Sequence, residues 1–310
     1  RRLQAPMWRG TVRTARGAPA DPQSMTETGY HLHLPAGAST NVVFSSPHSG
    51  RDYPAAFVAA SRLDRHGLRA SEDVLVDQLF DAAPALGAPL ICARWPRAWL
   101  DLNRAPTELD PALIVGAKTQ GVNQRVAAGL GVVPRVVAEG AEIYAGKISL
   151  SEARERIAIA HKPYHARLEA LLAEARERYG SAVLFDCHSM PSEALRAAPR
   201  VRGRMPEIVL GDRFGSSASR ATLAHTQRAF EEEGFVVARN APFAGGYITQ
   251  RYGRPQRGFQ AVQIEVDRGL YLDPRSLEPT AGFGEMCERL TRVVAALVRV
   301  TPELAAMAAE

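Results

Sequence analysis

Apolar and polar positions along the chain repeat with two different periods. Short apolar runs that end in small or polar residues predict buried β-strands, and longer stretches with apolar residues three or four apart predict helices. The expected strands are 41–46, 89–94, 181–187, 207–211, 235–239 and 260–266. The expected helices are 71–84, 150–179, 216–233 and 283–300. Strands that alternate with helices are typical of an α/β sheet covered by helices on both faces.

Specific residues mark the boundaries of two of these helices. Ser71 is the expected N-cap of the first helix. Ser149 and Glu152 form a capping-box pattern at the start of the second helix, and Pro163 should kink or split that helix. The region 105–150 is the least regular part of the chain. We expect it to form loops and a hairpin over one rim of the sheet.

The length of the chain, 310 residues, suits one large α/β domain. Residues 1–24 are rich in arginine and poor in large apolar side chains, so we expect a disordered leader followed by a single catalytic domain over 25–310. Hydrophobic residues make up 46% of the chain and charged residues 23%, which is ordinary for a globular protein. No apolar run approaches the roughly 18 residues of a membrane-spanning helix, so a membrane partner is not expected.

Charge and cysteine content narrow the class of partner. The net charge is +5, and the arginines are spread along the chain instead of forming a basic block. This pattern argues against nucleic-acid binding and fits a small anionic substrate. Cys92, Cys187 and Cys287 are odd in number and lack metal-type spacing, which is typical of reduced core thiols in a cytoplasmic protein. The sequence carries no signal for an oligomeric state.

Two histidines follow predicted strands in loops of small residues. His48 comes after the strand over 41–46, and His188 comes after the strand over 181–187. Ligands of open α/β sheets bind beyond the carboxyl ends of the strands. Two imidazoles placed there indicate half of a metal site. The motifs HExxH, GxSxG and GxGxxG, which mark other kinds of site, are absent.

A catalytic zinc ion needs a third protein ligand and an open position for water. Glu72 and Asp73 are the acidic residues best placed to fold back beside His48. On a helix, Asp77 would lie one turn from Asp73 and could support the site from behind. Acids in a first helical turn also serve simply to complement the helix dipole, and this alternative stays open.

Glu265 interrupts the apolar strand over 260–266 and should therefore be buried. A buried acid needs a partner or has a raised pKa. A raised pKa suits a general base that takes a proton from water. An ion pair with Arg268 or with another arginine is the alternative.

Further polar residues follow the strand over 89–94. Arg97, Asn103 and Arg104 lie just past its end, together with Asp101. A guanidinium can grip a carboxylate with two hydrogen bonds or can stabilise a developing oxyanion. These residues are therefore candidates for substrate binding.

Two other groups of residues are candidates for a functional role. The loop Gly245-Gly246-Tyr247 combines flexible glycines with a phenol, and we expect it to act as a lid over the substrate. His161 and His165 have the spacing of a helical metal pair, but Pro163 lies between them and no acid is near. We expect these two histidines to be structural.

A series of short motifs occurs in a fixed order between about residues 40 and 275. They are 47–50, 71–77, 101–104, 163–165, 186–190, 245–247 and 263–265. Together they resemble the N-formylglutamate amidohydrolases, relatives of the zinc carboxypeptidase-like hydrolases. The resemblance implies a single three-layer α/β/α domain with a mixed central sheet, of the zinc carboxypeptidase-like (phosphorylase/hydrolase-like) class.

The resemblance also implies roles for individual residues. His48, Asp73 and His188 would hold Zn²⁺ or another divalent metal. Glu265 would be the base, and Arg97 would polarise the substrate carbonyl. The implied substrate contacts are Asn103, Arg104, Gly246 and Tyr247.

Two positions depart from the pattern of the wider group. Arg51 stands where an acid is usual three residues after the first histidine, so that role passes to the Glu72-Asp73 pair, of which Asp73 is preferred. Asp267 and Arg268 stand where Asn-Arg is expected.

These roles predict metal-dependent hydrolysis of the formyl amide of N-formyl-L-glutamate, or of a close N-formyl amino acid, to formate and the free amino acid. Such a reaction implies a place in histidine degradation. Two alternatives stay open. One is a zinc deacylase or carboxypeptidase that acts on other N-acyl amino acids or short peptides. The other is a non-catalytic binding protein for acidic amino acids.

Overall fold

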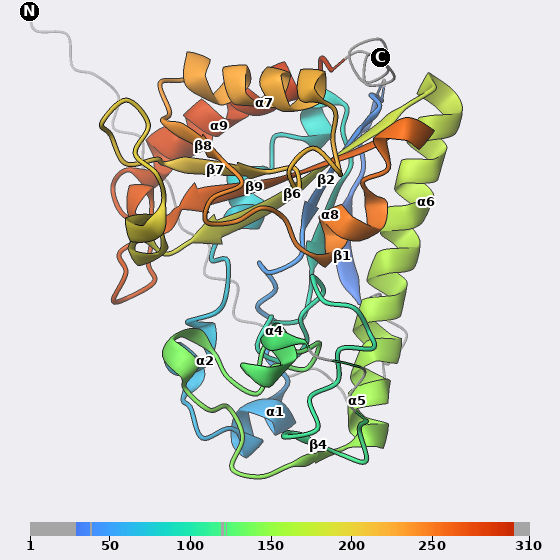
Figure 1. Ribbon diagram of the computed structural model, residues 1–310, viewed down its shortest axis with the longest axis vertical. Helices are drawn as coiled ribbons and strands as arrows, with labels where there is room; N and C mark the ends of the chain where they lie inside the picture. The colour runs from blue at the N-terminus through green and yellow to red at the C-terminus, as the bar shows by residue number, and fades with distance from the viewer. Residues whose placement is uncertain (1–28, 38, 119–120, 122, 301–310) are drawn as a thin grey trace, which may run out of the picture.

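A seven-stranded sheet forms the centre of the molecule (Figure 1). The computed structural model describes residues 29–37, 39–118, 121 and 123–300, so the expected leader over 1–24 lies outside the described residues. In spatial order the strands are β1 (Tyr30–His33), β3 (Leu90–Ala93), β2 (Val42–Ser46), β6 (Ala182–Met190), β9 (Phe259–Asp267), β7 (Ile208–Gly211) and β8 (Val237–Arg239).

The sheet is mixed, as expected. The central strands β3, β2, β6 and β9 run parallel to one another. The strand β1 is antiparallel to β3, and the pair β7 and β8 is antiparallel to β9. Because the central strands are parallel, their carboxyl ends lie at one edge of the sheet, where sequence reasoning placed the site.

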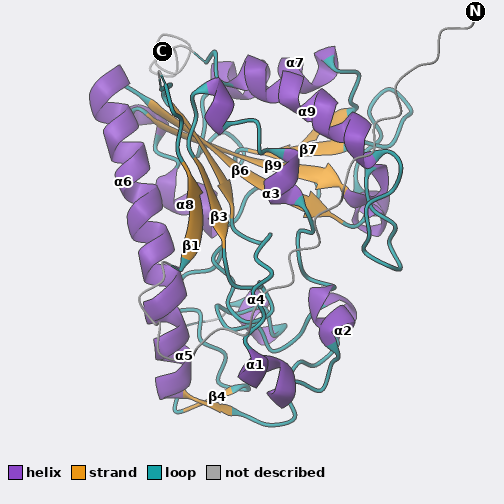
Figure 2. Cartoon of the chain, turned by 180° about the vertical axis from the view of Figure 1, so that it is seen from behind, coloured by secondary structure: helices purple, strands orange, loops and turns teal. Residues whose placement is uncertain are grey.

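Helices cover both faces of the sheet (Figures 1 and 2). The helices α3 (Val76–Leu79), α7 (Arg220–Glu232) and α9 (Phe283–Leu297) pack on one face, and α6 (Lys162–Tyr179) and α8 (Tyr247–Tyr252) pack on the other. Neighbouring strand residues serve opposite cores, as a period of two requires. Phe185 belongs to the core under α7 and α9, whereas Leu184 belongs to the core under α6. The three-layer α/β/α architecture is confirmed.

Each expected strand is present, but β6 runs three residues beyond the expected end at Cys187, to Met190. It does so because β9 pairs with it along its whole length, from Ala182 opposite Phe259 to Met190 opposite Asp267. His188 therefore lies within a strand and not in the loop after it.

The helix expected over 71–84 is largely absent. Leu75 has a left-handed backbone with φ of 62°, which a non-glycine residue adopts rarely, and α3 is limited to Val76–Leu79. The backbone N–H of Asp73 donates to the carbonyl of His48 instead of continuing a helix. Ser71 is therefore no N-cap.

The helix expected over 150–179 is present and continuous. Ser149 caps its start by accepting a hydrogen bond from the Glu152 N–H at α5 (Leu150–Arg156). A π-helical segment, Ile157–His161, joins α5 to α6 and replaces the expected break. Pro163 has no N–H to offer the helix, and a wider turn accommodates the proline without splitting the helix.

Residues 105–150 form loops with few regular elements. They hold α4 (Gln124–Ala127) and the two-residue strands β4 (Ile114–Val115) and β5 (Ile148–Ser149). These two strands pair in parallel and form no hairpin. The antiparallel pairing expected of a hairpin in this region is limited to a single bridge between Val136 and Glu142. Together with α1 (Ala55–Ala60) and α2 (Arg65–Arg69), these elements form a group below the sheet, beside α5 (Figure 2).

Candidate metal centre

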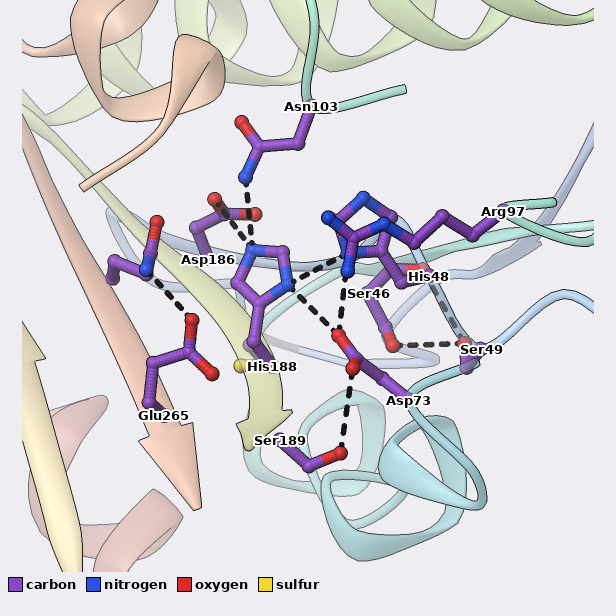
Figure 3. Close-up of polar contacts among 12 residues, drawn as sticks. Ser46, His48, Ser49, Asp73, Arg97, Asn103, Asp186, His188, Ser189 and Glu265 are labelled. Carbon is purple, nitrogen blue, oxygen red and sulfur yellow. Dashed lines mark hydrogen bonds and ion pairs between the residues drawn. The ribbon is translucent and has the colours of Figure 1, made fainter. Parts of the chain in front are cut away.

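His48, Asp73 and His188 converge on one point at the edge of the sheet (Figure 3). All three are buried. His188 Nδ1 lies 2.9 Å from Asp73 Oδ2 and 3.1 Å from His48 Nδ1, and His48 Nδ1 lies 3.3 Å from Asp73 Oδ2. A tetrahedral zinc ion with bonds of about 2.0–2.1 Å holds its ligand atoms roughly 3.3 Å apart. The spacing therefore suits a single small cation.

Neighbouring parallel strands bring the two histidines together. The strand β2 pairs with β6 only as far as Ser45, which is opposite Asp186. Beyond this point the chain turns away, and the end of β6 is left open beside His48. Gly50 permits the turn, because a Cβ there would lie 2.2 Å from the carbonyl oxygen of Trp95.

Each histidine is held from behind by a buried carboxylate. His48 Nε2 donates to Asp101 Oδ1 at 2.7 Å, and His188 Nε2 donates to Asp186 Oδ2 at 2.9 Å. A carboxylate can only accept, so each Nε2 carries a proton. Each Nδ1 points at the common point, where it offers a lone pair to a cation once it gives up its own proton. Metal-binding histidines are commonly oriented in this way.

The electrostatics of the centre also favour a cation. Burial alone would raise the pKa of Asp73, but hydrogen bonds from His188 and His48 outweigh it and hold the pKa well below its usual range. Burial alone would lower the pKa of His188, but Asp186 and Asp73 raise it well above the usual range. The surrounding acids therefore retain positive charge at this point. The donor set, two imidazoles and one carboxylate, fits a catalytic divalent metal ion.

The structure also distinguishes between the neighbouring acids. Glu72 turns away from the histidines, and its Oε2 accepts hydrogen bonds from Tyr53 and Arg69. Asp77 does not support the site, because it pairs with Arg51 at 2.6 Å in a partly exposed ion pair. The expectation for Asp77 was wrong because residues 73 and 77 do not share one helix.

Glu265 lies beside the metal-type cluster on the next strand. It is opposite His188 in the pairing of β6 with β9, so both side chains project from the same face of the sheet (Figure 3). Burial raises its pKa to about 7. Gln263 donates to its Oε1 at 2.8 Å. Arg268 does not form the ion pair considered for Glu265, because its guanidinium binds Asp73 at 2.8 Å.

A cavity of about 810 Å³ opens in front of these residues. Arg97, Asn103, Arg104 and Gly246 all line it. Its remaining wall is largely apolar and comes from the loops after β6 and β8 and from residues 128–140. The structure thus brings the predicted metal ligands, the predicted base and most of the predicted substrate contacts to one cavity.

The residues on the substrate side are held by hydrogen bonds to neighbouring loops. Arg97 Nε donates to Asp101 Oδ2 at 3.0 Å. Arg104 Nε donates to the Leu130 carbonyl at 2.9 Å. Asn103 Oδ1 accepts from the Ile248 N–H at 2.8 Å, and its Nδ2 lies 3.2 Å from His188 Nε2.

Known proteins resemble the chain over most of its length. A family model described as N-formylglutamate amidohydrolase matches residues 40–272. The chain belongs to the N-formylglutamate amidohydrolase family. It is accordingly a hydrolase.

Individual relatives in this amidohydrolase family agree with that placement. The N-formylglutamate deformylase of Pseudomonas aeruginosa is 30% identical over 260 residues, which cover 83% of this chain and 91% of that protein. The N-formylglutamate deformylase of Pseudomonas putida is 32% identical over 201 residues, or 64% of this chain and 69% of that protein. The crystal structure of N-formylglutamate amidohydrolase from Ralstonia eutropha JMP134 superposes with a TM-score of 0.83 at 31% identity and covers 89% of this chain and 99% of that one.

Among the predicted site residues of this amidohydrolase, Tyr247 does not reach the cavity. It begins α8, and its ring packs against His161 and His165. Its hydroxyl accepts a hydrogen bond from Arg251. Gly246 does line the cavity, where a Cβ would lie 2.4 Å from Asn103 Nδ2, so glycine is needed for the close approach. We therefore give Tyr247 no part in the proposed site.

Two carboxylates of the centre, Asp101 and Asp186, were not predicted as partners of the histidines. The sequence could have indicated Asp186, since it lies two residues before His188 in the same strand and must share its face. Asp101 had none, because a loop brings it to His48 from another part of the chain.

The remaining sequence expectations concern buried groups and membranes. His161 and His165 are buried and bind backbone carbonyls, as expected of structural histidines. All three cysteines are unpaired, and burial raises the pKa of the Cys187 thiol, which is unsuitable for a nucleophile. None of the helices in the described ranges is long and apolar enough to cross a membrane.

Proposed function

We propose that the chain hydrolyses the formyl amide of N-formyl-L-glutamate, or of a close N-formyl amino acid, to formate and the free amino acid in a metal-dependent reaction. The observation that carries this proposal is the convergence of His48, Asp73 and His188 beside Glu265 at one cavity. The names of the Pseudomonas and Ralstonia relatives support the choice of substrate.

The metal in this proposal is Zn²⁺. His48 Nδ1, His188 Nδ1 and Asp73 Oδ2 would hold it, with Asp101 and Asp186 fixing the two rings from behind. Bound there, the ion would supply Lewis-acid chemistry and would lower the pKa of a coordinated water to about 7.

Glu265 is the proposed general base. It takes a proton from the water that adds to the formyl carbon, and it returns that proton to the nitrogen as the carbon–nitrogen bond breaks. Its raised pKa suits both transfers near neutral pH. The Gln263 amide fixes one carboxylate oxygen, which leaves the other to exchange the proton. Arg97, on the cavity wall near His48, would stabilise the developing oxyanion (Figure 3).

Four arginines line the cavity, and two of them are neutralised by metal-centre acids. Arg97 binds Asp101 at 3.0 Å, and Arg268 binds Asp73 at 2.8 Å. These two cations balance the acids of the centre. They add little net charge for a dianionic substrate.

The other two arginines are available to substrate carboxylates. Arg104 Nη2 lies 3.9 Å from the nearest carboxylate oxygen, that of Asp101. Arg125 lines the cavity with no ion pair among the described residues. N-formylglutamate carries two carboxylates. We assign the α-carboxylate to Arg104, beside Asn103, and the side-chain carboxylate to Arg125.

The size and lining of the cavity favour a second candidate function. A volume of about 810 Å³ with a largely apolar far wall exceeds the needs of one formylated amino acid. The alternative is therefore a zinc deacylase or carboxypeptidase for larger N-acyl amino acids or short peptides.

One experiment separates these functions. Protein stripped of metal is reloaded with Zn²⁺ and given N-formylglutamate, N-acetylglutamate and a glutamate dipeptide in turn, with product release as the readout. We expect formate release that depends on Zn²⁺ and exceeds turnover of the other two substrates. Faster turnover of the dipeptide or acetyl compound would favour the alternative. Binding without any product would identify a non-catalytic binding protein.

We further propose that residues 25–310 act as one catalytic domain, in the cytoplasm, in histidine degradation. The continuous α5–α6 helix, which runs beside both the sheet and the lower group of elements, supports the single domain (Figure 1). The three unpaired cysteines support a reducing compartment.

A further inference from the structure

His161 and His165 lie outside the cavity, but both reach the loop that carries its substrate-binding side. His161 Nε2 donates to the carbonyl of Arg104 at 2.9 Å. His165 Nε2 donates to the carbonyl of Leu102 at 2.8 Å. The two rings pack against each other, with centroids 4.2 Å apart and their planes tilted by 37°. The continuous helix that carries both histidines thus binds the backbone of residues 101–104 at two carbonyls, those of Leu102 and Arg104.

A third residue contacts the other nitrogen of the His165 ring. The Leu102 carbonyl can only accept, so His165 carries its proton on Nε2. The hydroxyl of Tyr252, at the end of α8, lies 2.9 Å from His165 Nδ1 and donates to the His165 carbonyl at 3.1 Å. Burial lowers the pKa of His165 to about 3 and also lowers that of His161, so both rings are neutral at pH 7. Neutral rings can pack closely without charge repulsion.

The two carbonyls depend on these imidazoles. Among the described residues, neither carbonyl accepts a backbone hydrogen bond. The loop has other attachments: the Asp101 N–H donates to the Val132 carbonyl, the Asn103 N–H donates to Asp101 Oδ1, and the side chains of Asn103 and Arg104 bind neighbouring backbone groups. None of these hydrogen bonds reaches the carbonyl of Leu102 or of Arg104. A buried carbonyl that loses its donor moves toward water or another donor, because an unpaired polar group is costly to bury.

We propose that His161 and His165 are positioning residues that set the place of Arg104 and Asn103 in the cavity. The proposal rests on the proposed function, since it takes Arg104 as the contact for the substrate α-carboxylate. His161 acts through the carbonyl of Arg104 itself. His165 acts through Leu102, the residue before Asn103, with the Tyr252 hydroxyl in contact with the other nitrogen of its ring.

The test compares His161→Leu and His165→Leu with a matched control. His225 on α7 is another helical histidine, partly buried, and its Nε2 donates to the carbonyl of Ala296 at 3.0 Å, away from the cavity. The His225→Leu variant therefore loses the same kind of hydrogen bond without touching the loop. The His161→Gln variant keeps an N–H donor, and Tyr252→Phe removes only the hydroxyl that contacts the ring and the carbonyl of His165.

Two measurements are made on the full chain. Steady-state kinetics with N-formylglutamate should show KM raised roughly tenfold in His161→Leu, the effect of losing one hydrogen bond of ordinary strength, with kcat changed less. His161→Gln should recover most of this loss. Amide hydrogen exchange without substrate should speed up across 101–104 in both leucine variants and, to a smaller degree, in Tyr252→Phe. It should stay unchanged in β2.

The control variant decides the interpretation. If His225→Leu raises KM and speeds exchange across 101–104 as much as the other two leucine variants, the histidines act only on global stability and the proposal is wrong. If the leucine variants fail to fold, Tyr252→Phe and His161→Gln decide, and unchanged exchange across 101–104 in Tyr252→Phe would also overturn it. The exchange measurement needs no turnover. If the wild-type protein releases no formate, the proposed function fails while the positioning role can still be judged.

Discussion

The metal centre and the substrate side of the cavity are built in different ways. His188 lies within the central strand β6, whose pairing with β9 continues past it, and the backbone of Asp73 is tied to that of His48. On the substrate side, residues 97–140 contain a single strand among the described residues, the two-residue β4. Two of their backbone carbonyls are bound by the side chains of His161 and His165. In the proposed function, the reaction chemistry is thus anchored in the sheet, whereas selectivity would depend on loops that can vary without disturbing the sheet. Changes at the sheet edge should alter rate and metal binding, and changes in the loops should alter KM.

Glu265→Gln should have the largest effect. The variant keeps the size of the side chain and can still contact Gln263, but it cannot accept a proton. We expect kcat to fall by roughly 10²–10⁴, the usual contribution of a general base. Zinc content should not change, because Glu265 is not among the three ligand residues. Formate release and metal analysis check both statements. A variant that keeps more than about a tenth of the activity would remove Glu265 from the mechanism.

The pH dependence of kcat/KM should also report on Glu265. Burial raises the pKa of Glu265 from an ordinary value of 4.5 to about 7, and a bound cation would move it back toward the lower value. The base must be ionised, so kcat/KM should decrease as pH falls through the window from 7 to 4.5. The loss should approach about tenfold per pH unit below the pKa. An identical acid limb in Glu265→Gln would assign the titration to another group.

Asp186→Asn should weaken metal binding. Asparagine keeps the shape of the side chain but no longer offers a charged acceptor to His188 Nε2, so the ring is less firmly oriented. We expect a loss of roughly 10–100-fold in zinc affinity, measured by competition with a chelator. Asp212→Asn is the matched control, since Asp212 is also buried but follows β7 and does not line the cavity. Equal losses in both variants would mean that the sheet edge has no special role.

Arg125→Gln should affect binding of the substrate more than catalysis. If this guanidinium binds the side-chain carboxylate, KM for N-formylglutamate should rise about tenfold, and KM for N-formylalanine should not change. Arg154→Gln, which alters an exposed arginine on α5 outside the cavity, is the control. A similar rise for both substrates would place Arg125 on the α-carboxylate or in a general electrostatic role.

The parts of this site that sequence could predict are those that strands impose. The apolar runs before His48 and His188 mark two strands, and parallel neighbours must end at the same edge. The apolar neighbours of Glu265 likewise show that it is buried. Local pattern is enough in these cases because a strand fixes which way each side chain points.

The parts that sequence missed depend on tertiary contacts. The helix expected over 71–84 fails because Asp73 gives its N–H to His48, a contact that no local pattern shows. Asp101 reaches His48 through a loop fixed by distant carbonyl contacts. Arg125 was not singled out because it looks like any surface arginine until the cavity beside it is seen.

Tyr247→Phe should have the smallest effect. The hydroxyl of Tyr247 accepts a hydrogen bond from the partly exposed Arg251 and does not face the cavity, so its loss should change kcat and KM by less than about twofold. Gly246→Ala, one residue earlier, gives the contrast. Its Cβ would lie within 2.5 Å of both polar atoms of the Asn103 amide and should displace that side chain. A KM that rises several-fold in Tyr247→Phe would mean that the hydroxyl reaches bound substrate, and the loop that carries it would then act as a lid.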